Sequence, residues 1–137
     1  MLITVTRVLE EPGSSAGPLV EFRCAAGRAT ARWAGAVRPG LGDHDVELDV
    51  PETVSVFDRG EPGLDRVEGV LGAPGGSLPA GVRLCGRVEE VGVGEDPIVV
   101  LRVGGGLLMT ETDGPRPLPG AWVRLTVTEL VLCPTGI

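Results

Sequence analysis

The chain of 137 residues contains no lysine, asparagine, glutamine or tyrosine, and only one histidine, two phenylalanines and two tryptophans. Because aromatic side chains are so few, we expect the hydrophobic core to consist of valine, leucine, alanine and isoleucine. All twelve basic residues are arginine. This bias is typical of a GC-rich genome, so the number of arginines is not by itself evidence of a function.

Long apolar stretches are missing too. No stretch reaches the roughly 18 consecutive apolar residues of a transmembrane helix. The first residues, Met1–Arg7, alternate between apolar and polar and include no basic leader, which argues against a signal peptide. We therefore expect a cytoplasmic protein without a membrane segment. The three cysteines show no Cys-x-x-Cys spacing, and we expect them to be reduced and to serve as small buried residues.

The charge balance excludes one further class of function. Acidic residues outnumber basic ones by 19 to 12, the net charge is −7, and no segment of the chain is basic. Affinity for nucleic acids depends largely on the neutralisation of phosphates, so this balance argues against a general DNA or RNA binder. A small local group of arginines remains compatible with it.

Catalytic and metal-binding patterns are also absent. The one histidine, His44, stands between Asp43 and Asp45 in a turn that enters a strand, no serine lies in a Gly-x-Ser-x-Gly motif, and no cysteine has a neighbouring base. Asp45, Glu47 and Asp49 share one strand face at spacings of about 6.6 Å, too wide for all three to ligate one Ca²⁺. We therefore expect no catalytic residues, no metal site and no cofactor, and a charged outer face along this strand.

What the chain does contain is one pattern that occurs twice. The offset between matched residues starts at 80 and ends at 77, so few insertions are needed. Such self-similarity indicates a core built from two related halves. The matched pairs are Arg7-Val8 with Arg87-Val88, residues 19–24 with 98–103, residues 38–40 with 118–120, and residues 46–52 with 123–129.

Strand signals dominate both halves. In the first half, Val46, Leu48 and Val50 alternate with acidic residues, which is the pattern of a half-buried antiparallel strand. Four or five such strands in about 55 residues are typical of OB-type or SH3-like barrels. We therefore predict an all-β protein with two pseudo-equivalent small barrels packed together. The alternative is one joint barrel or sandwich of eight to ten strands.

The predicted organisation has three parts. A connector, residues 58–81, separates two β repeats. It is rich in glycine and proline, and we expect it to form either one helical turn or a loosely ordered linker. The helical turn would be formed by Leu64, Val67, Val70 and Leu71. The parts are a first β repeat at 1–57, the connector at 58–81 and a second β repeat at 82–137.

The last strands of the two halves should differ. Pro51 interrupts the first half, whereas no proline interrupts residues 121–133, so strands four and five of the second half should run on through a bulge. Continued alternation then points Val131 and Cys133 inward, and it places Leu130 and Leu132 on the outer face.

The end of each half resembles the end of TOBE-type OB domains, which occur as appendages of transport ATPases. This resemblance implies an OB-type barrel. Tandem units of this size also resemble the paired domains of molybdopterin-type oxyanion binders, but their Ser-Ala-Arg-Asn opening is missing here. The residues that carry the TOBE resemblance are Leu41–Asp43, Val46–Pro51 and Val54–Asp58, then Pro119-Gly120, Val123–Val127 and Leu130–Pro134.

The leading prediction for function is a non-enzymatic protein–protein interaction module. The outer face of the second half carries Ile98 and Val100 together with Trp122 and Arg124. Apolar residues on both faces of a strand imply burial on both faces, either inside the molecule or against a partner. Tryptophan and arginine are also enriched at binding hot spots. We expect the partner to be another protein or a second copy of the chain.

Two other functions stay open. Arg23 and Arg102 occupy equivalent outward positions and are candidates to frame a small anion between the repeats. A single-stranded nucleic-acid binder of OB type would instead need exposed aromatic side chains for stacking, and Trp33 and Trp122 are the candidates.

Overall fold

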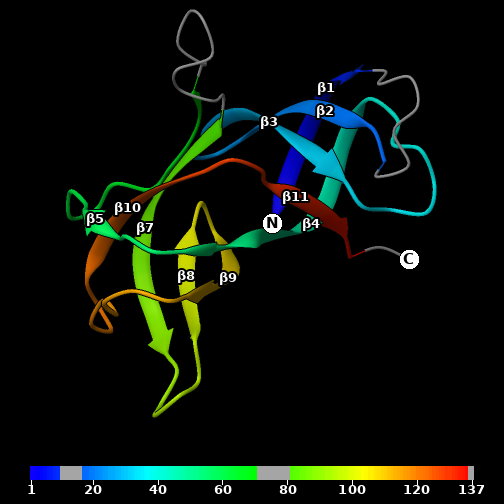
Figure 1. The fold of residues 1–137 in the computed structure, drawn as a ribbon. Coiled ribbons are helices and arrows are strands. Elements are labelled where there is room, and N and C mark those ends of the chain that lie inside the picture. Colours follow the sequence, from blue (N-terminus) through cyan, green and yellow to red (C-terminus); the bar gives the residue numbers. More distant parts are fainter. Residues whose placement is uncertain (10–16, 71–80, 136–137) are drawn as a thin grey trace, which may run out of the picture.

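The computed structural model describes residues 1–9, 17–70 and 81–135, and these residues form strands and turns without a helix (Figure 1). The all-β prediction is confirmed. No helix in this part of the chain is long and apolar enough to cross a membrane. The strands are β1 Leu2–Leu9, β2 Leu19–Cys24, β3 Gly27–Trp33, β4 Gly42–Val54, β5 Asp58–Arg59, β6 Arg66–Val70, β7 Gly81–Val91, β8 Ile98–Val103, β9 Gly106–Thr112, β10 Trp122–Val127 and β11 Val131–Pro134.

Eight of these strands form a closed barrel in the order β1–β2–β3–β6–β7–β8–β9–β4, and β4 pairs again with β1. Both halves of the chain contribute to it, as in the alternative that the sequence left open. The other strands extend this barrel. β11 pairs in parallel with β3 and antiparallel with β4, β10 pairs with β7, and β5 pairs with β10.

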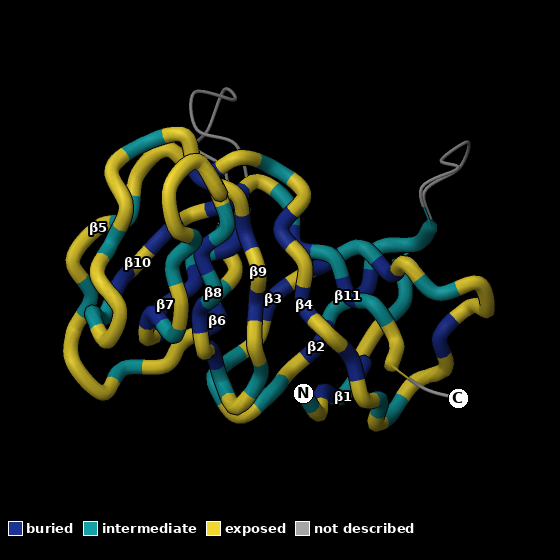
Figure 2. The backbone as a smooth tube through the Cα atoms, turned by 90° about the horizontal axis from the view of Figure 1, so that it is seen from below, coloured by how far each residue is buried: buried dark blue, intermediate teal, exposed yellow. Residues whose placement is uncertain are grey.

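Alternating burial along the strands produces the core (Figure 2). In β4 the side chains of Val46, Leu48 and Val50 are buried, and the acidic residues between them are exposed, as the period of two predicts. The core is aliphatic for the most part, with Phe22 and Trp33 as its large aromatic members. The expected use of cysteine holds for Cys85, which is buried, while Cys24 and Cys133 are half-buried.

The expectation for Pro51 is wrong. β4 continues through Pro51 to Val54, and its parallel register with β9 shifts between Asp49 and Thr53. A proline has no backbone N–H and cannot donate a hydrogen bond to a neighbouring strand. At a register shift the residue does not have to donate such a bond, so a proline is tolerated there. The exposed Pro51 therefore marks a shift of register against β9 within one long strand, and not the end of that strand.

The break falls in the second half instead, between β10 and β11. One carboxylate oxygen of Glu52 accepts hydrogen bonds from the backbone N–H of Thr128 at 2.6 Å, from its hydroxyl at 2.7 Å, and from the N–H of Glu129 at 3.2 Å. These three bonds hold the backbone in a bend, so the period of two does not carry over from β10 into β11. The predicted uninterrupted segment is therefore wrong.

This bend reverses the predicted orientation of the last strand. Leu130 and Leu132 are 0% exposed, whereas Val131 and Cys133 are half-buried. Leu132 lies opposite Leu48 of β4 and beside β3, where its carbonyl accepts from the N–H of Ala34 at 2.9 Å. The additional apolar outer face that the sequence predicted at these leucines does not exist.

The predicted connector contains two strands in its described part. β6 pairs in parallel with β3 and antiparallel with β7, and its Val67 is 1% exposed. The helical turn is therefore wrong, because the side chain that was expected to anchor it belongs to a strand of the barrel. Leu71 and the rest of the connector up to residue 80 lie outside the described residues.

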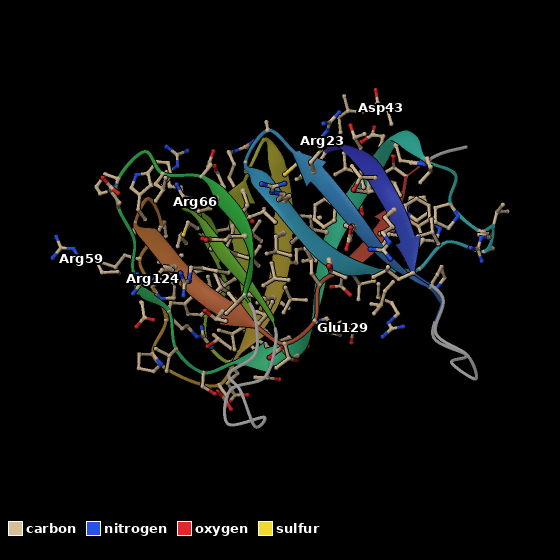
Figure 3. All side chains as sticks on the ribbon, turned by 90° about the horizontal axis from the view of Figure 1, so that it is seen from above. Arg23, Asp43, Arg59, Arg66, Arg124 and Glu129 are labelled. Atoms are coloured by element: carbon tan, nitrogen blue, oxygen red, sulfur yellow. The ribbon has the colours of Figure 1, made fainter. Side chains whose placement is uncertain are left out.

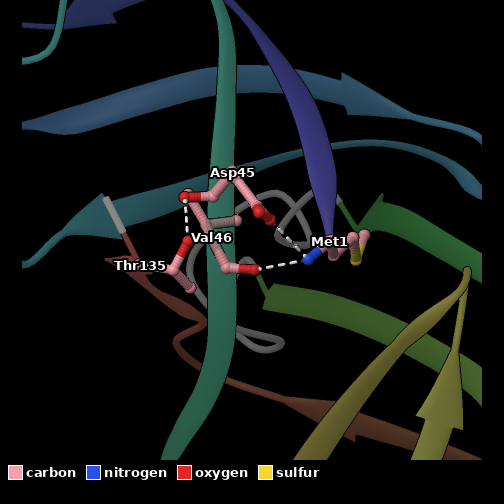
Figure 4. Close-up of polar contacts among 4 residues, drawn as sticks. All are labelled: Met1, Asp45, Val46 and Thr135. Atoms are coloured by element: carbon pink, nitrogen blue, oxygen red, sulfur yellow. Dashed lines mark hydrogen bonds and ion pairs between the residues drawn. The ribbon is translucent and has the colours of Figure 1, made fainter. Parts of the chain in front are cut away.

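Two strands, β1 and β4, meet the segment after β11 near the start of β1 (Figure 4). The Met1 amino group donates to the carboxylate of Asp45 at 2.9 Å and to the carbonyl of Val46 at 2.8 Å. The carbonyl of Asp45 accepts from the N–H of Thr135, beyond the end of β11, at 3.1 Å. The ammonium group beside it lowers the pKa of the Asp45 carboxyl below its ordinary value. These contacts join β1, β4 and the segment after β11.

Candidate interaction surfaces

Ile98 and Val100 lie on the outer face of β8, as expected, and both are half-buried. Val100 stands opposite Met109 of β9, and Leu107 follows on the same face of that strand. Met109 is 58% exposed and Leu107 is 51% exposed. The four residues Ile98, Val100, Leu107 and Met109 form one apolar surface on a two-stranded hairpin, which we call the β8–β9 patch.

Acidic side chains border the β8–β9 patch. Glu90 of β7 stands opposite Val100, Asp49 of β4 stands opposite Met109, and Glu111 stands opposite Ile98. A cavity of about 300 Å³ adjoins the patch between Met109 and the part of β4 that contains Asp49. The patch is therefore an apolar surface with three acidic residues and Arg102 at its border and a hollow at one side.

Trp122 and Arg124 lie elsewhere on the same sheet. Both are on β10, Trp122 half-buried and Arg124 exposed. Arg87 stands opposite Trp122 on one side and opposite Arg102 on the other. The carboxylate of Glu89 accepts from Arg102 at 2.7 Å and from Arg87 at 3.1 Å, and these bonds lower the pKa of Glu89. An ion-paired group therefore separates Trp122 from the β8–β9 patch.

Among the described residues, no contact brings Arg23 and Arg102, the two candidates for an anion site, together. Arg102 forms an ion pair with the carboxylate of Glu89. Arg23 stands opposite Arg28 in the β2–β3 pair, and both arginines line a groove of about 640 Å³. The arginine next to Arg23 at this groove is therefore Arg28 and not Arg102, and no repeat in the sequence indicates this pair.

The tryptophan expected to stack on bases is in the core. Trp33 is 3% exposed, and its indole N–H donates to the carbonyl of Val37 at 3.0 Å. The ring of His44 packs edge-on against it with centroids 5.1 Å apart, and the His44 ring nitrogen lies 2.7 Å from the carbonyl of Gly40. Trp33 therefore has no free face for a nucleic acid, and His44 is part of strand packing.

The sequence contained a signal for part of what was missed. The two-residue turn Gly104-Gly105 fixes the hairpin register, so that Met109 has to face Val100. Arg66, which shares a hollow of about 290 Å³ with Arg28, has no such signal, because the sequence predicts a connector for its segment. In the part of the chain that the structure describes, no group of three or more histidine, cysteine or acidic residues is arranged to hold a metal ion.

Comparison of the chain with protein-family models, curated proteins and solved structures finds no match.

Proposed function

We propose that this protein is a non-enzymatic interaction module that binds another protein through the β8–β9 patch. The observation that supports this is the exposure of Met109 and Leu107, 58% and 51%, beside Val100 and Ile98 on one face of a hairpin. Scattered exposed apolar residues are ordinary on a surface, whereas a contiguous group bordered by charge is typical of a binding site.

The border indicates the chemistry of the partner. Glu90, Asp49 and Glu111 border the patch, while Arg102 stands opposite Leu107. The acidic face of β4 continues from Asp49 with Glu47 and Asp45. A complementary partner has an apolar centre with basic residues around it, because opposite potentials speed association and disfavour wrong partners. The cavity beside Met109 offers space for one side chain of that partner.

The test is affinity capture from the native host with the wild-type chain and with a Val100→Ser, Met109→Ser double variant. If the patch is a hot spot, the double variant binds the captured partner about 30-fold more weakly, which corresponds to about 2 kcal/mol. Val93→Ser is the matched control, because Val93 is apolar, 90% exposed and outside the patch. Equal binding by all three proteins would remove the patch from the proposal.

The same assay examines the residues on β10. If docking extends across the sheet, Trp122→Ala with Arg124→Ala also weakens binding without lowering the melting temperature. If this double variant melts far below wild type instead, the role of Trp122 is in packing.

We further propose that the two halves of the chain are an internal duplication of an OB-type unit, with each half completed by a strand from the other. In both halves three antiparallel strands form a meander, and the fourth strand pairs with the first, as β1 with β4 and β7 with β10. The first half has no fifth strand of its own to pair with β3, and β11 of the second half takes this position. The parallel neighbour of β9 is the end of β4, from the first half.

Matching irregularities support the duplication. β1 and β7 each have a register shift, between Val5 and Arg7 and between Val88 and Glu90. The N–H of Trp33 donates to the carbonyl of Pro18, and the N–H of Thr112 donates to that of Pro97, both at 2.9 Å and 79 residues apart. When the two register shifts are superposed, Thr4-Val5 is equivalent to Arg87-Val88. The sequence comparison had aligned Arg7-Val8 with Arg87-Val88 instead.

Complementation of fragments tests this exchange. Residues 1–70 and 71–137, expressed separately, should each remain unfolded, because each lacks its fifth strand. Mixed in equal amounts, they should regain the circular dichroism spectrum of the intact chain. A fragment that folds alone with a cooperative transition contradicts the exchange.

A further inference from the structure

Five of the twelve arginines lie on β2, β3, β6, β7 and β10, which are successive neighbours in the sheet. Figure 3 labels three of them, Arg23, Arg66 and Arg124. This arrangement arises only in the fold, since the residues are spread over a hundred positions of the chain. Four of the five are exposed and one is half-buried. We call these residues the arginine band: Arg23, Arg28, Arg66, Arg83 and Arg124.

The strand registers place three of these arginines in one row. Arg23 stands opposite Arg28, Arg28 stands opposite Glu68, and Glu68 stands opposite Arg83. Directly opposite side chains are about 5 Å apart at their Cβ atoms. The row thus contains three guanidinium groups and one carboxylate, with the carboxylate between Arg28 and Arg83.

The neighbouring row places Cys85 between Arg66 and Arg124. The Cys85 side chain is short and 4% exposed, so the longer arginine side chains extend beyond it on both sides. Burial raises the pKa of the Cys85 thiol, and the positive charges of Arg124, Arg66 and Arg83 act in the opposite direction. Three guanidinium groups therefore surround one point of the surface.

One of the five arginines of the band forms an ion pair to a carboxylate among the described residues, and Asp58 of β5 stands opposite Arg124 in the sheet. The carboxylate of Glu68 lies 3.9 Å from Arg66, and that of Glu21 lies 4.0 Å from Arg7, outside the band. Within the described residues, no ion pair to a carboxylate is formed by the other four arginines of the band. Like charges directly opposite each other in a sheet cost stability unless a counter-charge lies between them. On a chain of net charge −7, this band is a local exception.

The surface is also hollowed where the band crosses from β2 to β6. The groove of about 640 Å³ is lined by Arg23 and Arg28 and by the hydroxyl-bearing Thr6 and Thr30, and two carboxylates, Glu21 and Glu68, also line it. A second hollow of about 290 Å³ lies between Arg28 and Arg66. Sites for small ligands usually have volumes of about 300–1,000 Å³. The first groove is within that range, and guanidinium and hydroxyl groups are suitable donors to phosphate oxygens.

We propose that the arginine band binds a ligand with several linked phosphate groups. Arg23 and Arg124 are four strand intervals apart, or about 19 Å at about 4.8 Å per interval. A single oxyanion contacts at most two or three of these guanidinium groups, whereas a linked series of phosphates contacts more of them. The net charge of −7 and the burial of Trp33 disfavour a nucleic-acid strand as the ligand. This site is separate from the β8–β9 patch and does not depend on it.

Isothermal titration calorimetry at 50 mM salt tests the proposal with inorganic phosphate, tripolyphosphate and ATP as probes. Tripolyphosphate should bind at least tenfold more tightly than phosphate. Arg28→Gln and Arg83→Gln should each weaken tripolyphosphate binding at least tenfold. Arg116→Gln is the charge-matched control, because Arg116 is exposed, lies outside the band and donates to the carbonyl of Gly92. It should bind within twofold of wild type.

ATP distinguishes two sources of the phosphates. Affinity equal to that of tripolyphosphate indicates that phosphates alone are recognised, and tighter binding of ATP indicates a nucleotide. Absence of tripolyphosphate binding by the wild type overturns the proposal. So does equal weakening in Arg28→Gln and Arg116→Gln, which would indicate diffuse charge attraction. Melting curves without ligand check folding, and Arg23→Gln replaces any variant that does not fold.

Discussion

Replacement of Leu132 by alanine discriminates between the two orientations of the last strand. In the structure the Leu132 side chain is 0% exposed and lies between β3 and β4, opposite Leu48. The regular alternation of the sequence would instead place Cys133 in the core. The two orientations therefore predict opposite effects for alanine at these adjacent positions.

The magnitude follows from burial. Removal of a buried leucine side chain loses roughly 2–3 kcal/mol of transfer free energy, and the remaining cavity raises the total to about 3–5 kcal/mol. Cys133 is half-buried opposite the exposed Glu47, so Cys133→Ala should cost less than about 1 kcal/mol. Since small proteins are stable by about 5–15 kcal/mol, the Leu132 variant should be folded but weakened.

Urea denaturation followed by tryptophan fluorescence measures both effects, because the buried Trp33 lies on β3 beside Leu132. With a slope of about 1–3 kcal/mol per molar urea, a loss of about 3–5 kcal/mol should lower the midpoint of Leu132→Ala by about 1–5 M. Leu118→Ala is the control, because Leu118 is 76% exposed. A larger loss for Cys133→Ala than for Leu132→Ala would refute the orientation of β11.

Three further predictions concern single polar groups and one thiol. Glu52→Ala should lower the free energy of unfolding by about 1–2 kcal/mol in urea denaturation, because it leaves the donors of Thr128 without their shared acceptor. The contact of Glu89 with Arg102 lowers the pKa of Glu89 in the folded state, so the contact stabilises the protein fully above the ordinary carboxyl pKa and less as the pH falls below roughly 4. Melting temperatures from pH 7 to pH 3 should therefore decrease less in Glu89→Gln than in wild type, and equal decreases would count against that contact. Cys85 is 4% exposed with a raised pKa, so a maleimide should label it only after unfolding, and rapid labelling of the folded protein would contradict its burial.

Much of the candidate interaction surface follows from local rules. Ile98 and Val100 were predicted on the outer face because strands alternate, and the Gly104-Gly105 turn then determines that Met109 faces Val100. The position of Trp122 relative to them depends on which strand lies between β8 and β10. That strand is β7, and its Arg87 separates the two groups.

The sequence by itself determined the fold class, the buried face of β4 with its exposed acidic residues, and the outer faces of β8 and β10, because period-two alternation is a local property of the chain. Tertiary structure alone decided three other features. The bend held by Glu52 reversed the orientation of β11, since its bonds join residues 76 and 77 positions apart. β6 became a barrel strand because β3 and β7 both pair with it. The arginine band formed because strand pairing brings together side chains that have no relation along the chain.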